Sequence, residues 1–134
     1  MVFNSKMETA EEFIKRKDEQ FNRELNEDKL IPFKDITRKG KFYFKREDWI
    51  ILQQHNYPEK VFVFEKLKWI KSDVRGNSGS KSEGDIEYRL GYFIVGKIGN
   101  RRGKWTWGQY CPLIPIKDFQ KLMKLAKEKG VIIE

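Results

Sequence analysis

The sequence predicts an α+β fold, in which a curved antiparallel sheet or small, partly open barrel is flanked by N- and C-terminal helices. Four segments in the middle of the chain have the composition or the two-residue alternation of strands. Segments near both ends repeat apolar residues with the helical period. Gly91 and Gly96 interrupt the clearest strand, which indicates bulges or a bend of the kind that a small barrel needs. The length of 134 residues fits one domain, 1–134.

The first predicted helix spans residues 5–27. Two capping-box patterns, one starting at Ser5 and one at Thr9, mark its beginning. Its apolar residues fall on one narrow face, and they are Ala10, Phe13, Ile14, Phe21 and Leu25. That face needs a partner to cover it, whereas the rest of the helix has mixed charge and is typical of a solvated surface.

The second predicted helix spans residues 116–129, directly after Pro115. Its apolar stripe consists of Phe119, Leu122, Met123 and Ala126, which are spaced as i, i+3, i+4 and i+7. Gly130 follows at the position where helices commonly end.

The predicted strands are 41–45, 60–70, 86–98 and 104–113, and residues 131–133 form a short final strand. The turn at 99–103 has the glycine and asparagine chemistry that joins two strands into a hairpin. We call residues 97–104 the basic hairpin.

The segments between these elements are less clear. Residues 28–40, which contain Pro32, form a connection after the first helix. Residues 46–54 fit a buried strand or a short helix, and we favour the helix because Glu47 and Asp48 suit a first turn. Residues 72–85 contain three glycines and four serines and are typical of a flexible loop.

The net charge of +8 is distributed unevenly. Residues 1–40 contain nine basic and nine acidic residues, whereas residues 41–134 contain nineteen and eleven. No acidic residue lies between Glu87 and Asp118. Ten Phe, five Tyr and four Trp argue against a disordered chain. A field of one sign attracts anions, so the basic part, 41–134, is expected to meet a polyanion.

Cys111 is the single cysteine, so no intramolecular disulfide is possible, which fits a reducing compartment. The N-terminal residues lack the apolar stretch of a signal peptide, and no apolar run reaches the length of a membrane-spanning helix. We therefore expect a cytoplasmic protein without a membrane partner.

The basic hairpin and the strand that follows it suggest the function. Four cations in this region, together with Arg89 on the preceding strand, suit contacts to phosphate. The four are Lys97, Arg101, Arg102 and Lys104. Trp105 and Trp107 share one face of the return strand, where they either stack on bases or pack in the core. The leading hypothesis is a non-catalytic nucleic-acid-binding module, for DNA or RNA, that needs no cofactor.

Two other functions remain open. A small Mg²⁺-dependent nuclease or phosphodiesterase would use Asp48 and Glu65 to hold the metal against a phosphate, with Lys68 beside them. Alternatively, the basic surface binds an acidic protein partner. A nucleotide-binding phosphate loop is rejected, because Gly91 to Lys97 matches the pattern only in part and Ile98 stands where Ser or Thr is required.

Overall fold

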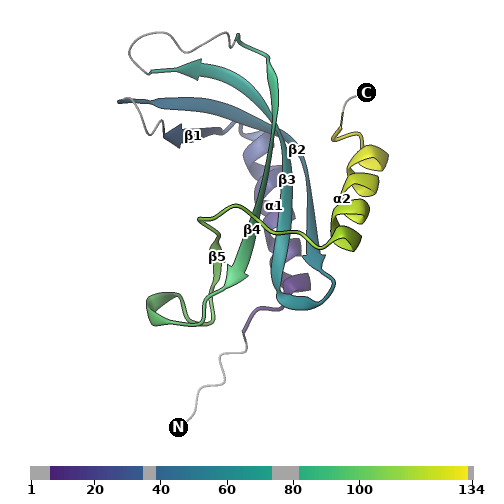
Figure 1. The fold of residues 1–134 in the computed structure, drawn as a ribbon. Coiled ribbons are helices and arrows are strands. Elements are labelled where there is room, and N and C mark those ends of the chain that lie inside the picture. The colour runs from purple at the N-terminus through teal and green to yellow at the C-terminus, as the bar shows by residue number, and fades with distance from the viewer. Residues whose placement is uncertain (1–6, 35–38, 74–81, 133–134) are drawn as a thin grey trace.

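The computed structural model describes residues 7–34, 39–73 and 82–132. It has a helix α1 (Ala10–Asn26), five strands and a helix α2 (Ile116–Lys129). The strands are β1 (Leu30–Lys34), β2 (Lys41–Gln54), β3 (Tyr57–Ser72), β4 (Ile86–Val95) and β5 (Trp105–Trp107). The five strands are antiparallel neighbours in chain order and form one curled sheet, a half-barrel with the two helices beside it (Figure 1). The predicted α+β class is therefore confirmed.

The two helices cover opposite faces of β3. Val61 and Val63 pack with residues of α1, whereas Phe62 and Phe64 pack with Leu122 and Ala126 of α2. Because successive side chains of a strand point to opposite faces, a run of four apolar residues is what a strand with both faces covered requires. β3 is consequently the centre of the core, and its residues 61–65 are all buried.

The expectation of a short helix at 46–54 was wrong, because this segment continues β2. Trp49 and Ile51 face α1, and Ile50 and Leu52 face α2. A strand covered on both sides lacks polar alternation, so its apolar run has the same appearance as a short buried helix. The register between β2 and β3 also shifts between Arg46 and Asp48, which marks a β-bulge.

Several predicted boundaries also need correction. The connection 28–40 contains strand β1, where Pro32 is tolerated because β1 lies at the edge of the sheet. Strand β4 ends at Val95 and β5 covers only three residues. Val131 and Ile132 are not in a strand. Of the predicted flexible loop 72–85, Ser72 belongs to β3, and residues 74–81 lie outside the described residues.

The helix signals were largely correct, although α1 begins at Ala10 and not at residue 5, since residues 7–9 are not helical. Thr9 caps α1, and its hydroxyl and the carboxylate of Glu12 form the reciprocal capping box; Ser5 lies outside the described residues. Gly130 ends α2 in the left-handed conformation, with φ +83°. Phe119 is the exception, because it is 45% exposed while Asp118 is buried. Neither helix of the described residues has the length and apolar character that crossing a lipid bilayer demands.

Gly91 allows a close approach and not a bulge, since the register of β3 and β4 is continuous there. A Cβ atom at this position would lie 2.4 Å from Cη2 and 2.6 Å from Cζ2 of Trp107.

We expect Gly91→Ala to lower the free energy of unfolding by about 1–3 kcal/mol, as overpacking does. Urea unfolding measures the change. In a Trp107→Leu background the clash is absent, so Gly91→Ala should lower the free energy of unfolding by a smaller amount. An equal loss in both backgrounds would contradict the contact between Gly91 and Trp107.

Candidate functional site

The basic hairpin projects beyond the end of β4 (Figure 1). Its turn is held by backbone hydrogen bonds, from the Gly96 amide to the Lys104 carbonyl at 3.0 Å and from the Gly103 amide to the Gly96 carbonyl at 2.9 Å. Arg101, Arg102 and Lys104 are exposed, and none of them forms an ion pair with a residue that the structure describes. The turn therefore presents three cations to solvent on a backbone with fixed shape.

Lys97 differs from these three residues. Its ammonium group is paired with the carboxylate of Glu59, which raises the pKa of Lys97 through their hydrogen bond. Its backbone carbonyl accepts a hydrogen bond of 3.4 Å from Nε of Arg102. Glu59 thus offsets the charge of Lys97, so this residue adds less to the positive field of the hairpin.

Both tryptophans of β5 pack beneath α1. Trp105 stacks on Phe13 with ring centroids 4.7 Å apart, and its indole N–H donates to the backbone carbonyl of Glu8 at 2.8 Å. Trp107 meets Phe93 edge to face at 4.9 Å. These contacts are those of side chains that pack in the core. Neither ring lies beside the exposed cations of the hairpin.

Tyr110 is an exposed aromatic residue that our site prediction left out. It is 81% exposed and follows β5 in the chain. Strand parity does not account for this exposure, because β5 ends at Trp107 and the alternation of side chains does not extend to residue 110.

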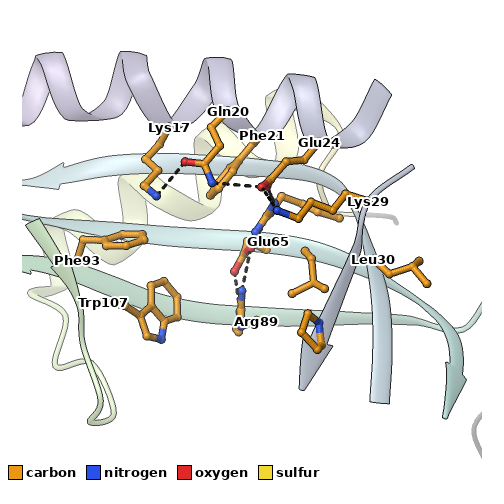
Figure 2. A pocket seen from close by; sticks show the side chains of 13 residues that line it. Lys17, Gln20, Phe21, Glu24, Lys29, Leu30, Glu65, Arg89, Phe93 and Trp107 are labelled. Atoms are coloured by element: carbon orange, nitrogen blue, oxygen red, sulfur yellow. Dashed lines mark hydrogen bonds and ion pairs between the residues drawn. The ribbon is translucent and has the colours of Figure 1, made fainter. Parts of the chain in front are cut away.

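Arg89 lies under α1 and not on the basic hairpin. Its Nε donates to Oε1 of Glu65 at 2.7 Å, and its Nη2 donates to Oε2 at 3.1 Å. Arg46 donates from Nε to the same Oε2 at 2.7 Å, and from Nη1 to Glu24 of α1 at 2.9 Å. Glu65 is 1% exposed and Arg46 8%. We call Glu24, Arg46, Glu65 and Arg89 the buried ion network (Figure 2).

Aromatic rings hold the two guanidinium groups of this network in place. The guanidinium carbon of Arg46 lies 3.6 Å from the ring centroid of Phe21. That of Arg89 lies 4.5 Å from Phe33 and 4.9 Å from Trp107. Cation–π contacts and charge-assisted hydrogen bonds together hold each guanidinium in position.

The network lines a cavity of about 330 Å³ between α1, β1 and the inner face of the sheet (Figure 2). Burial alone would raise the pKa of Glu24, but hydrogen bonds from Gln20, Lys29 and Arg46 outweigh it and keep that pKa below its ordinary value. Lys17 reaches the cavity from α1. Burial lowers the pKa of Lys17, and the nearby charge of Arg16 adds to this effect.

The residues proposed for a nuclease are not brought together. Glu65 faces α1, whereas Asp48 pairs with Lys129 of α2 at 2.8 Å, on the other side of the sheet. Nζ of Lys68 lies 3.7 Å from Oε1 of Glu47, so this lysine pairs with a different acidic residue. Among the residues that the structure describes, no group of three His, Cys, Asp or Glu side chains is placed to hold a metal ion.

Sequence reasoning missed Arg46, Glu24 and Lys17 as cavity residues. The bulge after Arg46 changes the parity of β2, so that Arg46 and Trp49 face the same side although they are three residues apart. Lys17 did give a signal, since it lies in the apolar stripe of the first helix.

The chain matches no protein-family model, no curated protein and no solved structure. Its function is therefore inferred from its own residues.

Proposed function

We propose that this chain is a non-catalytic module that binds nucleic acid, and that Arg101, Arg102 and Lys104 of the basic hairpin contact phosphates. The observation that supports this proposal is the exposure of these three cations on a hydrogen-bonded turn, without a carboxylate partner among the described residues. Phosphate contacts supply most of the affinity of proteins that bind nucleic acid without sequence preference. Arginine suits them because its planar fork matches the phosphate oxygens.

The sequence around the hairpin adds to this support. No acidic residue occurs between Glu87 and Asp118, and the carboxylate of Glu59 beside the hairpin is paired with Lys97, so local repulsion of a polyanion is small. The proposal assigns phosphate contacts only, since Trp105 and Trp107 are engaged beneath α1. Both DNA and RNA carry phosphates, so both are ligands for this turn.

The test is fluorescence anisotropy with labelled single- and double-stranded oligonucleotides over a series of salt concentrations. For wild type, a plot of the logarithm of the affinity against the logarithm of the salt concentration should be a falling line. Each phosphate that the protein neutralises should contribute about 0.7–0.9 to the steepness of its slope. Replacing Arg101 and Arg102 together by alanine should weaken binding. The slope of log affinity against log salt concentration should also become less steep, by about 0.7–0.9 for each phosphate that the variant no longer neutralises.

A matched control removes two exposed cations from α1, Lys15 and Arg23. The double variant Lys15→Ala/Arg23→Ala has the same net charge as the hairpin variant, so it should bind almost as tightly as wild type if the position of the charges decides binding. Equal reductions of affinity in both variants would show only a nonspecific charge effect. No binding by wild type at low salt would exclude nucleic acid and leave an acidic protein as the partner to seek.

A further inference from the structure

The cavity beneath α1 has an excess of positive charge. Its lining includes four basic residues, Lys17, Lys29, Arg46 and Arg89, and two acidic residues, Glu24 and Glu65. Both carboxylates are engaged: Glu65 accepts hydrogen bonds from the two arginines, and Glu24 accepts from Arg46, Lys29 and Gln20. An anion that enters the cavity would therefore meet cations whose charge is incompletely balanced.

Lys17 is the cation of this cavity without a carboxylate partner among the described residues. Its ammonium group donates to the side-chain oxygen of Gln20 at 3.0 Å and lies 5.0 Å from the ring centroid of Phe93. A neutral amide and an aromatic face stabilise an ammonium less than a carboxylate does. Burial also lowers its pKa, which is the cost of holding this charge away from water. An anionic group beside Lys17 would remove that cost.

Arg46 and Arg89 have N–H donors that the contacts to Glu65 and Glu24 do not use. Each guanidinium has five N–H donors, and the contacts to Glu65 and Glu24 use two from each arginine. Cation–π contacts with Phe21, Phe33 and Trp107 help to hold the two guanidinium groups in position. Binding to such fixed groups loses little side-chain entropy.

The other walls of the cavity are apolar. Phe21, Leu30, Phe93 and Trp107 line it, and Figure 2 shows the rings of Phe93 and Trp107 beside Arg89 and Glu65. The volume of about 330 Å³ is within the range of small-molecule sites, which combine apolar walls with a few polar groups. It is too small for a polymer, so this site is distinct from the basic hairpin.

We propose that the cavity between α1 and the sheet binds a small organic anion with a planar apolar body, such as an aromatic carboxylate, sulfonate or phosphate ester. The anionic group lies at Lys17 and Arg89, and the apolar body packs against the wall that Phe93 and Trp107 form together. This site is independent of nucleic-acid binding by the hairpin.

Two dyes that differ in one group test the proposal. The probe is 8-anilinonaphthalene-1-sulfonate, and the control is N-phenyl-1-naphthylamine, which has the same rings without the sulfonate. Fluorescence titration of the full chain should show that the sulfonate dye binds at one site about tenfold more tightly, since a charge-assisted hydrogen bond is worth about this factor. The indole N–H signal of Trp107 in the ¹H–¹⁵N NMR spectrum should shift on binding.

Variants of Lys17 complete the test. Lys17→Gln should remove most of the preference for the sulfonate dye while leaving the affinity for the neutral dye unchanged. Lys17→Arg should keep the preference, and Lys15→Gln on the exposed face of α1 should have no effect. Equal affinity of wild type for the two dyes, an unchanged preference in Lys17→Gln, or an unshifted Trp107 signal would each overturn the proposal. The last result would place the dye elsewhere, for example on exposed Tyr110, Leu113 and Ile116.

Discussion

Glu65→Gln should lower the free energy of unfolding by about 3 kcal/mol, as measured by urea denaturation. Removing one partner of a buried ion pair costs about 3–5 kcal/mol, because the remaining charge is left buried and uncompensated. Here one carboxylate, 1% exposed, accepts hydrogen bonds from both Arg46 and Arg89. Glutamine keeps the shape of glutamate and one acceptor oxygen, so we place the effect at the lower end of that range.

Glu59→Gln is the matched control, since it makes the same chemical change in an ion pair with exposed Lys97. An ion pair at the surface contributes about 0–1 kcal/mol. If both variants were destabilised by the same small amount, Glu65 would not be the centre of a buried network. A third variant, Arg46→Met/Glu65→Leu/Arg89→Met, replaces three of the four network residues by apolar side chains and leaves Glu24 paired with Lys29. It should be close to wild type in stability. The same variant keeps Lys17 but lacks Arg89, so its preference for the sulfonate dye should be smaller than that of wild type.

Phe13→Ala should lower the free energy of unfolding by about 3–5 kcal/mol. Phe13 is 1% exposed and packs with Val61, Phe93 and Trp105, together with Ala10 and Ile14 of α1. The destabilisation combines the loss of apolar burial, the cavity that remains and the loss of ring contacts with two aromatic neighbours. Domains of this size are stable by about 5–15 kcal/mol, so the variant would be close to the limit of folding.

Phe119→Ala is the control for Phe13. The apolar stripe of the sequence placed Phe119 in the core, but the structure leaves it 45% exposed on α2. We therefore expect a destabilisation below about 1 kcal/mol, as for most surface substitutions. Urea unfolding followed by tryptophan fluorescence measures both variants under one set of conditions. A larger effect for Phe119→Ala than for Phe13→Ala would contradict the placement of the two helices.

The sequence predicted those parts of the fold that depend on local chemistry. The capping box at Thr9, the end of α2 at Gly130 and the alternation of β4 are local signals, and all three appear in the structure. Strand β1 was missed because Pro32 is acceptable only at a sheet edge, and a single sequence does not reveal which strand lies at the edge.

The hairpin cations could be found from the sequence because charge and turn residues are adjacent in the chain. The buried ion network could not, because Glu24, Arg46, Glu65 and Arg89 come from four different elements. Their meeting depends on the register of three strands and on the bulge after Arg46. The same bulge separates Glu65 from Asp48, which the sequence had suggested as partners at a metal site.

The most direct test of nucleic-acid binding by the hairpin is NMR chemical-shift mapping of the ¹⁵N-labelled chain. Single-stranded DNA and RNA oligonucleotides are titrated in parallel at about 50 mM salt, where phosphate contacts are strong. We predict saturable shifts of the backbone amides of residues 97–104 with at least one oligonucleotide, while the amides of Glu65 and Arg89 stay in place. No saturable shifts with either oligonucleotide, or shifts only outside the hairpin, would contradict the proposed function.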